Sequence, residues 1–383
     1  MSEQDETDKT EQVKPENEEV KTSEKAEPAE PEKAEPAESE NAQQAKPDEP
    51  IQAKPKRKRK KWPFIVGGIV LFLFIAYWVV VYFLVSAALV PEFMRKLESF
   101  STLTEKEVAN QKHTDDIEKN SRKELDETEL WWESIHKEKL TITSEDGYKL
   151  VAAYIPAEKE SHDWVLVLHG YTGLKEEMYP FARQYWLKGY NALVPDLRCQ
   201  GESEGDFIGM GCTDSVDCML WLKEILKRDP EARIVLHGQS MGAATALIMT
   251  GMEELPSAVR AVVSDCSYTD AYNMFKAKIR DWFSLPAFPL VNSARLMLKM
   301  RGGYDLYDAS AIEAVKQSHT PTLFIHGTDD MLISAEMSKE LYEAEACSKK
   351  ELLLIEGAGH AQAQDKDPEL YYSTIFTFLD AVD

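Results

Sequence analysis

The 383-residue sequence predicts an α/β protein whose sheet is mostly parallel and covered by helices on both faces. Three observations support this prediction. From Lys139 onward, short apolar runs alternate with stretches long enough for a helix. The first two runs are joined by an Asp146-Gly147 turn, which is typical of a hairpin. A later run stops at a glycine-serine turn that leads directly into a helix-friendly segment.

Eight apolar runs are candidate strands. The first two are expected to pair as a hairpin, and helix-length segments separate the other six, which predicts parallel pairing. In sheets of this kind the chemistry gathers at the carboxyl ends of the strands. The candidate strands are residues 140–144, 150–155, 164–168, 191–195, 233–236, 261–263, 322–325 and 351–355.

Residues 1–62 are expected to be a disordered, acidic tail that ends in a basic cluster. Up to residue 54 the tail holds almost no large apolar side chain, and the sequence of residues 24–31 recurs nearly unchanged at 32–39. Such a segment cannot bury enough apolar surface to offset the entropy lost on ordering. Six consecutive basic residues, 56–61, then close the tail.

Residues 63–91 are expected to form a transmembrane helix. Residues 64–90 carry no charge, and this length spans a bilayer with some tilt. The basic cluster before the helix predicts that the tail is cytoplasmic and that the chain after Pro91 is extracytoplasmic. A cleaved signal peptide is the alternative, but the apolar run is about twice the length of a signal core. We therefore expect an uncleaved, single-pass anchor in the cell membrane.

Two further segments follow the anchor. Residues 92–138 are charged and helix-prone and contain Trp131 and Trp132. They are expected to form a juxtamembrane helical stalk or an amphipathic helix that packs on the next domain, with the tryptophans covering its core. The main domain is expected at residues 139–383.

Composition excludes some classes of partner and cofactor. The formal net charge of −23 argues against nucleic acid, whose phosphates are bound by clustered Lys and Arg. The five cysteines form no C-x-x-C pair and show no zinc-like spacing with histidine, so no metal site is predicted. An odd number leaves at least one thiol unpaired, and a bridge between Cys212 and Cys218 stays open at this stage.

The glycine-serine turn is the strongest candidate for a catalytic element. It reads Gly238-Gln239-Ser240-Met241-Gly242, and the segment after it is rich in Ala, Leu and Ile. A strand, a sharp G-x-S-x-G turn and a helix in this order form a nucleophile elbow, which exposes the serine hydroxyl in strained backbone geometry. Ser240 is the predicted nucleophile.

A serine nucleophile needs a histidine to take its proton, and that histidine needs a carboxylate to hold its tautomer. His360 follows the last candidate strand, where small residues give it room to approach Ser240. Asp330 follows the seventh candidate strand, and its spacing from His326 favours it over the neighbouring Asp329 as the orienting acid. The order serine, aspartate, histidine along the chain fits this assignment.

These motifs resemble the α/β-hydrolase superfamily, specifically its bacterial serine-esterase and serine-aminopeptidase-like branch, over roughly residues 139–380. The resemblance implies an α/β-hydrolase fold, and it rests on an oxyanion-type loop at 169–173, a D-x-R-G-x-G-x-S-x-G-like segment at 196–205, the elbow, H-G-x-x-D at 326–330 and G-x-G-H at 357–360. The chain departs from the usual residues at 199–200, and it has Ile-Ser where the family commonly has Val-Pro at 333–334.

The resemblance also implies an oxyanion hole made of two backbone N–H groups, those of Met241 and Tyr171. Three other histidines, His169, His237 and His326, each precede a glycine at a strand end. They are expected to pack or to form hydrogen bonds within the loop layer.

Residues 267–321 are expected to form a cap insertion. The segment has 55 residues, whereas a crossover between parallel strands needs about a dozen. It is rich in aromatic residues and locally basic. One interpretation is an aromatic acyl pocket with a positive rim, and the other is a set of core aromatics with solvated cations.

The expected function is hydrolysis of a small-molecule carboxylic ester through an acyl-enzyme on Ser240, with no cofactor and no metal. A serine peptidase of the aminopeptidase type and an acyltransferase remain open, because the same elbow serves all three. The basic cap favours esters over substrates with a free amine. From a different class of protein, a binding or sensor module that kept the fold without the activity also remains open.

Overall fold

The structure is a computed structural model that describes residues 61–96 and 115–382. Side chains are described for these residues except 94–96, 282 and 283. The expected disordered tail at 1–60 and the middle of the expected stalk, 97–114, therefore lie outside the described residues. The described residues belong to one compact unit.

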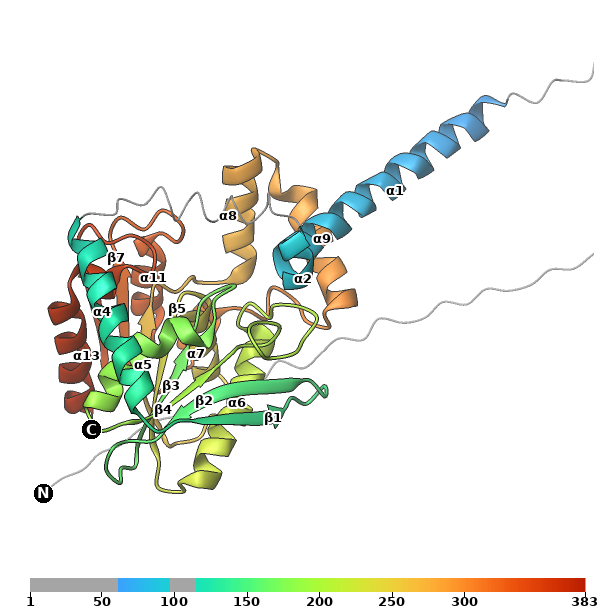
Figure 1. The fold of residues 1–383 in the computed structure, drawn as a ribbon. Coiled ribbons are helices and arrows are strands. Elements are labelled where there is room, and N and C mark those ends of the chain that lie inside the picture. The colour runs from blue at the N-terminus through green and yellow to red at the C-terminus, as the bar shows by residue number, and fades with distance from the viewer. Residues whose placement is uncertain (1–60, 97–114, 383) are drawn as a thin grey trace, which may run out of the picture. The chain divides into compact units, whose positions relative to one another are not determined.

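The sheet has eight strands in the order β1-β2-β4-β3-β5-β6-β7-β8, which confirms the predicted fold class (Figure 1). Strand β2 pairs antiparallel with both β1 and β4, and all other pairs are parallel, so the hairpin prediction is also confirmed. The strands are β1 (Glu138–Thr143), β2 (Lys149–Ile155), β3 (Asp163–Leu168), β4 (Asn191–Pro195), β5 (Arg233–Gln239), β6 (Val259–Asp265), β7 (Thr322–Gly327) and β8 (Lys350–Ile355).

Helices cover both faces of the sheet (Figure 1). Helices α6 and α7 pack on one face, and α5 and α13 pack on the other. The helices are α1 (Trp62–Leu89), α2 (Pro91–Lys96), α4 (Asp115–Ser134), η1 (Lys175–Met178), α5 (Tyr179–Leu187), α6 (Cys212–Arg228), α7 (Met241–Thr250), α8 (Ala271–Phe283), α9 (Ala287–Arg301), α10 (Ala311–Val315), α11 (Ala335–Ala344), α12 (Ala363–Lys366) and α13 (Pro368–Val382).

Alternating side chains of each central strand divide the core in two. In β3, Leu166 and Leu168 join the apolar cluster with α6 and α7, whereas Val165 and Val167 join the cluster with α5 and α13. Successive side chains of a strand point to opposite faces, and here both faces are buried. This explains why the central strands appear in the sequence as unbroken apolar runs rather than as an apolar-polar alternation.

Helix α4 packs against α5 through aromatic and charged contacts. Trp131 is buried in the cluster on this face, as expected, and Trp132 stacks on Tyr179 with ring centroids 3.9 Å apart. At the rim, Arg183 pairs with Glu124 of α4 at 3.1 Å.

Helices α8, α9 and α10 lie between β6 and β7, in the segment where the cap was expected. The five cysteines are free thiols, so the Cys212–Cys218 bridge that the sequence left open is absent.

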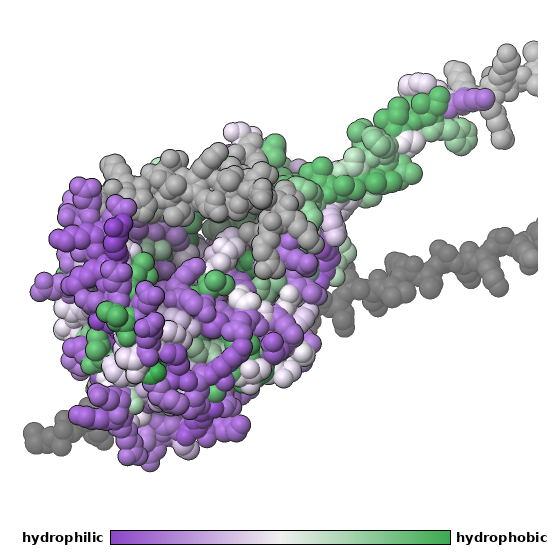
Figure 2. Space-filling view, viewed as in Figure 1, coloured by the Kyte–Doolittle hydropathy of each residue, from purple (hydrophilic) through white to green (hydrophobic). Residues whose placement is uncertain are grey.

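Helix α1 has two different parts. Among the described residues it is the one helix that is long and apolar enough, by length and composition, to cross a membrane. Most side chains between Trp62 and Val80 are exposed, and Figure 2 shows hydrophobic residues gathered along this helix. Val81, Val85 and Leu89 are buried instead, and they belong to the same apolar cluster as α6 and α7.

Candidate active site

Ser240 stands at a sharp turn between β5 and α7. Its φ of 56° and ψ of −115° lie in a region of backbone conformation that residues with a side chain rarely adopt. A Cβ built on Gly238 would lie 2.2 Å from backbone atoms of Gly242, and one built on Gly242 would lie 2.2 Å from the Leu168 carbonyl oxygen. Only glycine fits at these two positions, so the strand and the helix meet closely and hold Ser240 at the sheet edge.

The structure brings the three predicted side chains together. The distance between Ser240 Oγ and His360 Nε2 is 2.9 Å, and His360 Nδ1 lies 2.7 Å from Asp330 Oδ2. Because a carboxylate only accepts hydrogen bonds, the imidazole proton belongs on Nδ1, and Nε2 is left to accept from the serine hydroxyl. This is the arrangement in which histidine can remove the hydroxyl proton.

Asp330 is held by four hydrogen bonds. Its Oδ1 accepts the backbone N–H groups of Leu332 and Ile333, each at 2.8 Å. Its Oδ2 accepts from His360 and, at 3.0 Å, from His326 Nε2. Every acceptor direction of the buried carboxylate is therefore used, and its orientation toward His360 is fixed.

Asp329, the rival in the sequence, is exposed and contacts Thr328. Of these two aspartates, Asp330 is the one that bonds to His360, at 2.7 Å.

His326 is a neighbour of Asp330 for which the sequence predicted no catalytic role. It was expected only to pack or to form hydrogen bonds within the loop layer, and it is indeed fully buried. Its Nε2 faces two acceptors, Asp330 Oδ2 and the Ile333 carbonyl oxygen at 2.9 Å, so Nε2 carries the proton. Its Nδ1 lies 2.6 Å from Ser338 Oγ and accepts from that hydroxyl. The only signal in the sequence was its H-G-x-x-D spacing.

The hydrogen bonds keep Asp330 ionised. Burial by itself would raise the pKa of this carboxyl, but the bonds from His326 and His360 outweigh burial and hold its pKa below the ordinary value. The opposite holds for the nearby Asp265, because burial raises its pKa to about 6. Asp265 contacts the elbow through its backbone, since its carbonyl oxygen accepts the Ser240 N–H at 2.8 Å.

The loop after β3 lies directly beside the nucleophile. A Cβ built on Gly170 would lie 3.9 Å from Ser240 Oγ. Tyr171, the next residue, lines the cavity at Ser240 together with Met241. Met241 is the first residue of α7, so its backbone N–H has no partner one turn earlier in the helix. The two predicted oxyanion-hole residues thus line the same cavity as Ser240.

The two remaining strand-end histidines have structural partners. His169 Nε2 accepts the Leu197 backbone N–H at 2.9 Å, which ties the loop after β3 to the loop after β4. His237 lies between the hydroxyls of Tyr185 and Tyr371, and burial lowers its pKa to about 3. It is therefore neutral at physiological pH. It packs and forms hydrogen bonds as expected, but within strand β5 in the core rather than in the loop layer.

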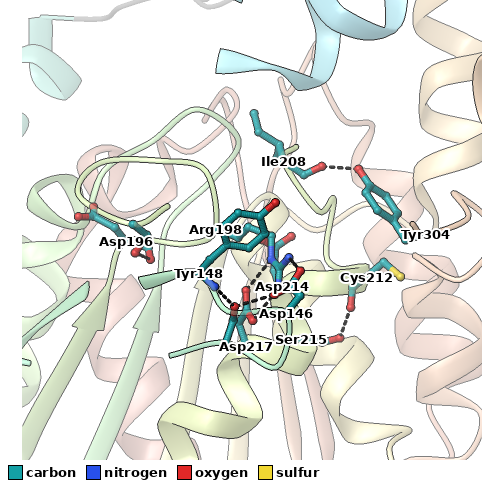
Figure 3. A network of polar contacts seen from close by, with 12 residues as sticks. Asp146, Tyr148, Asp196, Arg198, Ile208, Cys212, Asp214, Ser215, Asp217 and Tyr304 are labelled. Atoms are coloured by element: carbon teal, nitrogen blue, oxygen red, sulfur yellow. Dashed lines mark hydrogen bonds and ion pairs between the residues drawn. The ribbon is translucent and has the colours of Figure 1, made fainter. Parts of the chain in front are cut away.

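Arg198 anchors the loop after β4 (Figure 3). Its guanidinium donates twice to Asp217 of α6, each time at 2.8 Å, and twice to Asp146 in the hairpin turn, at 2.5 and 3.1 Å. Further along the same loop, the Ile208 carbonyl oxygen accepts from the Tyr304 hydroxyl. These bonds hold the loop at Arg198 and at Ile208, and Met210, near the end of the loop, lines the cavity at Ser240.

A cavity of about 130 Å³ opens beside Ser240. Most residues that line it are apolar, and no Asp or Glu is among the described residues of its wall. Tyr268 and Phe275 of the expected cap contribute, in keeping with an aromatic pocket. Of the basic residues in this segment, Lys278 lines the cavity, whereas Arg295 and Lys299 pair with Asp305.

One group of potential metal ligands includes two residues of this site. Ligand atoms of Cys266, Asp330 and His360 lie within 4.8 Å of one another. However, Asp330 and His360 already bond to each other, and burial raises the pKa of the Cys266 thiol far above its ordinary value, which disfavours the thiolate that a metal binds. The donor set does not fit a metal ion.

Comparison with known proteins agrees with the fold. The model of the alpha/beta hydrolase family matches residues 165–373, more than half of the chain. The uncharacterised protein YqkD of Bacillus subtilis is 29% identical over 251 residues, which cover 65% of this chain and 81% of that protein. A Bacillus subtilis carboxylesterase is 21% identical over 243 residues, 57% of this chain and 93% of its own. An esterase structure from Pyrococcus furiosus has a TM-score of 0.54 at 24% identity, covering 65% of this chain and 92% of that one.

Proposed function

The chain belongs to the alpha/beta hydrolase family, and we propose that it is a serine hydrolase that cleaves a carboxylic ester with Ser240, His360 and Asp330. The observation that carries this proposal is the continuous hydrogen-bonded chain from Ser240 Oγ through His360 to Asp330, with distances of 2.9 and 2.7 Å. The strained elbow that presents Ser240 is the second support.

The proposed reaction has two stages. His360 Nε2 takes the proton of Ser240 as the oxygen attacks the ester carbonyl carbon, and the N–H groups of Met241 and Tyr171 bind the negative charge that develops on the carbonyl oxygen. His360 then gives its proton to the leaving alcohol, and the acyl group stays on Ser240. A water molecule, deprotonated by His360, attacks this acyl-enzyme and releases the acid.

An ester is favoured over a peptide with a free amino terminus. A free ammonium group in a pocket calls for a carboxylate to pair with it, because an unpaired buried charge is costly. The described wall of the cavity at Ser240 offers no carboxylate. An acyl ester needs only an apolar pocket for its chain, which this wall provides.

Active-site labelling tests the proposal. The full-length protein, purified in detergent, is treated with a fluorophosphonate probe and assayed with p-nitrophenyl butanoate, in parallel with Ser240→Ala. We expect the wild type to be labelled and to turn over the ester, and the variant to do neither. A folded wild-type protein that is not labelled would rule out an activated serine and favour the binding-module alternative.

We further propose that α1 anchors the protein in the cell membrane, with the hydrolase domain extracytoplasmic and the tail cytoplasmic. The support is the length and apolarity of α1 and the basic residues 56–61 before it. Protease treatment of intact cells should remove the hydrolase domain and leave the tail protected. Protection of the hydrolase domain until the cells are lysed would reverse the proposed orientation.

A further inference from the structure

We propose that the last turns of α1 form a wall of the acyl pocket, so that the anchor helix takes part in choosing the substrate. The pocket would take the hydrocarbon chain of an acyl ester while Ser240 attacks its carbonyl carbon. This inference rests on the proposed serine hydrolase function. Five α1 residues share the wall of one cavity with Ser240, namely Val81, Leu84, Val85, Ala88 and Leu89.

A further part of the wall comes from the segment between β6 and β7. Helices α8 and α9 supply apolar side chains, including Phe275, Ile279 and Leu298. Of all the described lining residues, the only charged one is Lys278, and its ammonium donates to the Met331 carbonyl oxygen at 3.3 Å. An apolar cavity of this kind favours a hydrocarbon chain, because burying methylene groups is favourable while burying an unpaired polar group is costly.

Hydrogen bonds fix the end of α1 to the hydrolase domain. The Tyr77 hydroxyl donates to Ser293 Oγ of α9 at 2.7 Å, and Arg301 donates to Ser86 Oγ at 3.0 Å. The Arg301 guanidinium also lies over the ring of Tyr82, 4.1 Å from its centroid. A simple tether would need none of these contacts, so α1 has a defined orientation on the domain.

Two more bonds join α1 to the loops after β3 and β4. The Ile208 backbone N–H donates to the Leu89 carbonyl oxygen at 2.9 Å, on the loop that Arg198 holds (Figure 3). The Tyr171 hydroxyl, in the loop beside Ser240, donates to the Ala88 carbonyl oxygen. The same turn of α1 thus contacts the acyl pocket and the proposed oxyanion loop.

The position of the pocket along α1 fits an apolar substrate. Residues 62–76 precede Tyr77, the residue that bonds to α9, and 15 residues at about 1.5 Å each span roughly 22 Å, most of the hydrocarbon thickness of a bilayer. The pocket therefore begins where the helix is expected to leave the lipid. The chemistry is that of a hydrocarbon acyl ester, which reaches the site either dissolved in water or from the bilayer.

A substitution inside the pocket tests the inference in the full-length protein. Val85 is 3% exposed and lines the pocket, so Val85→Trp places a large ring in it. The matched control is Val80→Trp, because Val80 is on the same helix, 53% exposed and outside the pocket wall. The readout is the ratio of kcat/KM for the octanoyl ester to kcat/KM for the butanoyl ester. It is measured with p-nitrophenyl esters in detergent and with monoacylglycerols in phosphatidylcholine vesicles.

Each methylene buried is worth about 4-fold in kcat/KM, so blocking the pocket for four methylenes should lower the octanoyl-to-butanoyl ratio by at least about 10-fold. We expect this loss in Val85→Trp and no change in Val80→Trp. A loss in the p-nitrophenyl series shows that the wall acts on soluble esters, and a loss in the vesicle series shows that it acts on lipid esters. Unchanged ratios in both series would overturn the inference.

Two controls separate the possible failures. If Val85→Trp does not fold, Val85→Ala decides instead, because a wider pocket should raise the octanoyl-to-butanoyl ratio about 3-fold or more, and an unchanged ratio overturns the inference. Fluorophosphonate labelling of the wild type reports the proposed function independently of α1. If the wild type is labelled but the Val85 variants do not change the ester ratio, the serine hydrolase proposal holds and the role of α1 is refuted. If the wild type is not labelled, both proposals are refuted.

Discussion

Replacing Asp330 by asparagine should abolish most of the activity, and the structure shows why a nearly isosteric change would do so. The backbone N–H groups of Leu332 and Ile333 both donate to Oδ1. An asparagine at this position keeps these bonds only with its amide oxygen on that side. Its NH2 group must then occupy the position of Oδ2, which accepts from His360 and His326.

An NH2 group facing the N–H of His360 places donor against donor. His360 relieves this conflict by moving its proton to Nε2, so that Nδ1 accepts from the amide. With the proton on Nε2, the imidazole no longer accepts the proton of Ser240, which lies 2.9 Å away. The same change of tautomer in a Ser-His-Asp triad costs about 10⁴ in kcat, or ~5.5 kcal/mol at 1.36 kcal/mol per decade.

The assay is steady-state hydrolysis of p-nitrophenyl butanoate by the full-length protein. We expect kcat of Asp330→Asn to fall about 10⁴-fold, with a much smaller change in KM, because the acyl pocket is untouched. The matched control is Asp329→Asn, which removes the same charge from the neighbouring, exposed residue. A kcat for Asp330→Asn within about 10-fold of the wild type, or an equal loss in both variants, would refute the reasoning from the fixed amide oxygen.

Two further predictions concern the network in Figure 3. Arg198→Ala leaves the carboxylate of Asp217, 3% exposed, without its cation, so the variant should lose about 3–5 kcal/mol of folding stability and about 10 °C in its thermal midpoint. The control is Arg280→Ala, at an exposed ion pair, which should change the midpoint little. Equal midpoints for the two variants would contradict this prediction. Burial raises the pKa of Asp214 to about 7, so its contribution to stability is present below about pH 4 and is lost as pH rises through 7. The thermal midpoint of Asp214→Asn should therefore fall less than that of the wild type as the pH rises from 5 to 8, as measured by differential scanning fluorimetry. If the midpoints of the two proteins have the same pH dependence, Asp214 does not titrate in this range.

Local patterns were sufficient to predict the eight strands and the elbow. The alternation of apolar runs with helical segments reflects a periodicity that each element carries in itself. The elbow is also local in part, because a Cβ on Gly238 would lie 2.2 Å from backbone atoms of Gly242 in the same turn. For this reason the sequence also indicated Ser240 without any knowledge of the fold.

Residues that act from a distance were harder to predict. The preference for Asp330 over Asp329 rested only on spacing, whereas the structure separates a buried carboxylate from an exposed one. Apart from the H-G-x-x-D spacing, nothing in the sequence indicated that His326 bonds to Asp330, because a histidine before a glycine looks the same whether it packs or orients a carboxylate. The Arg198 network joins residues up to 71 positions apart, from Asp146 to Asp217, and sequence spacing does not encode such contacts.

Helix α1 shows most clearly what the sequence by itself cannot determine. Its length and lack of charge are properties of composition, so the sequence by itself determined that residues 64–90 prefer an apolar environment. Which environment each part of the helix meets was decided only by the tertiary structure. Val81, Val85 and Leu89 are buried in the hydrolase domain, whereas most side chains before them are exposed. The reason is physical: apolar burial has no direction, so lipid and protein satisfy the same side chains equally well, and only the surrounding chain determines which one they meet.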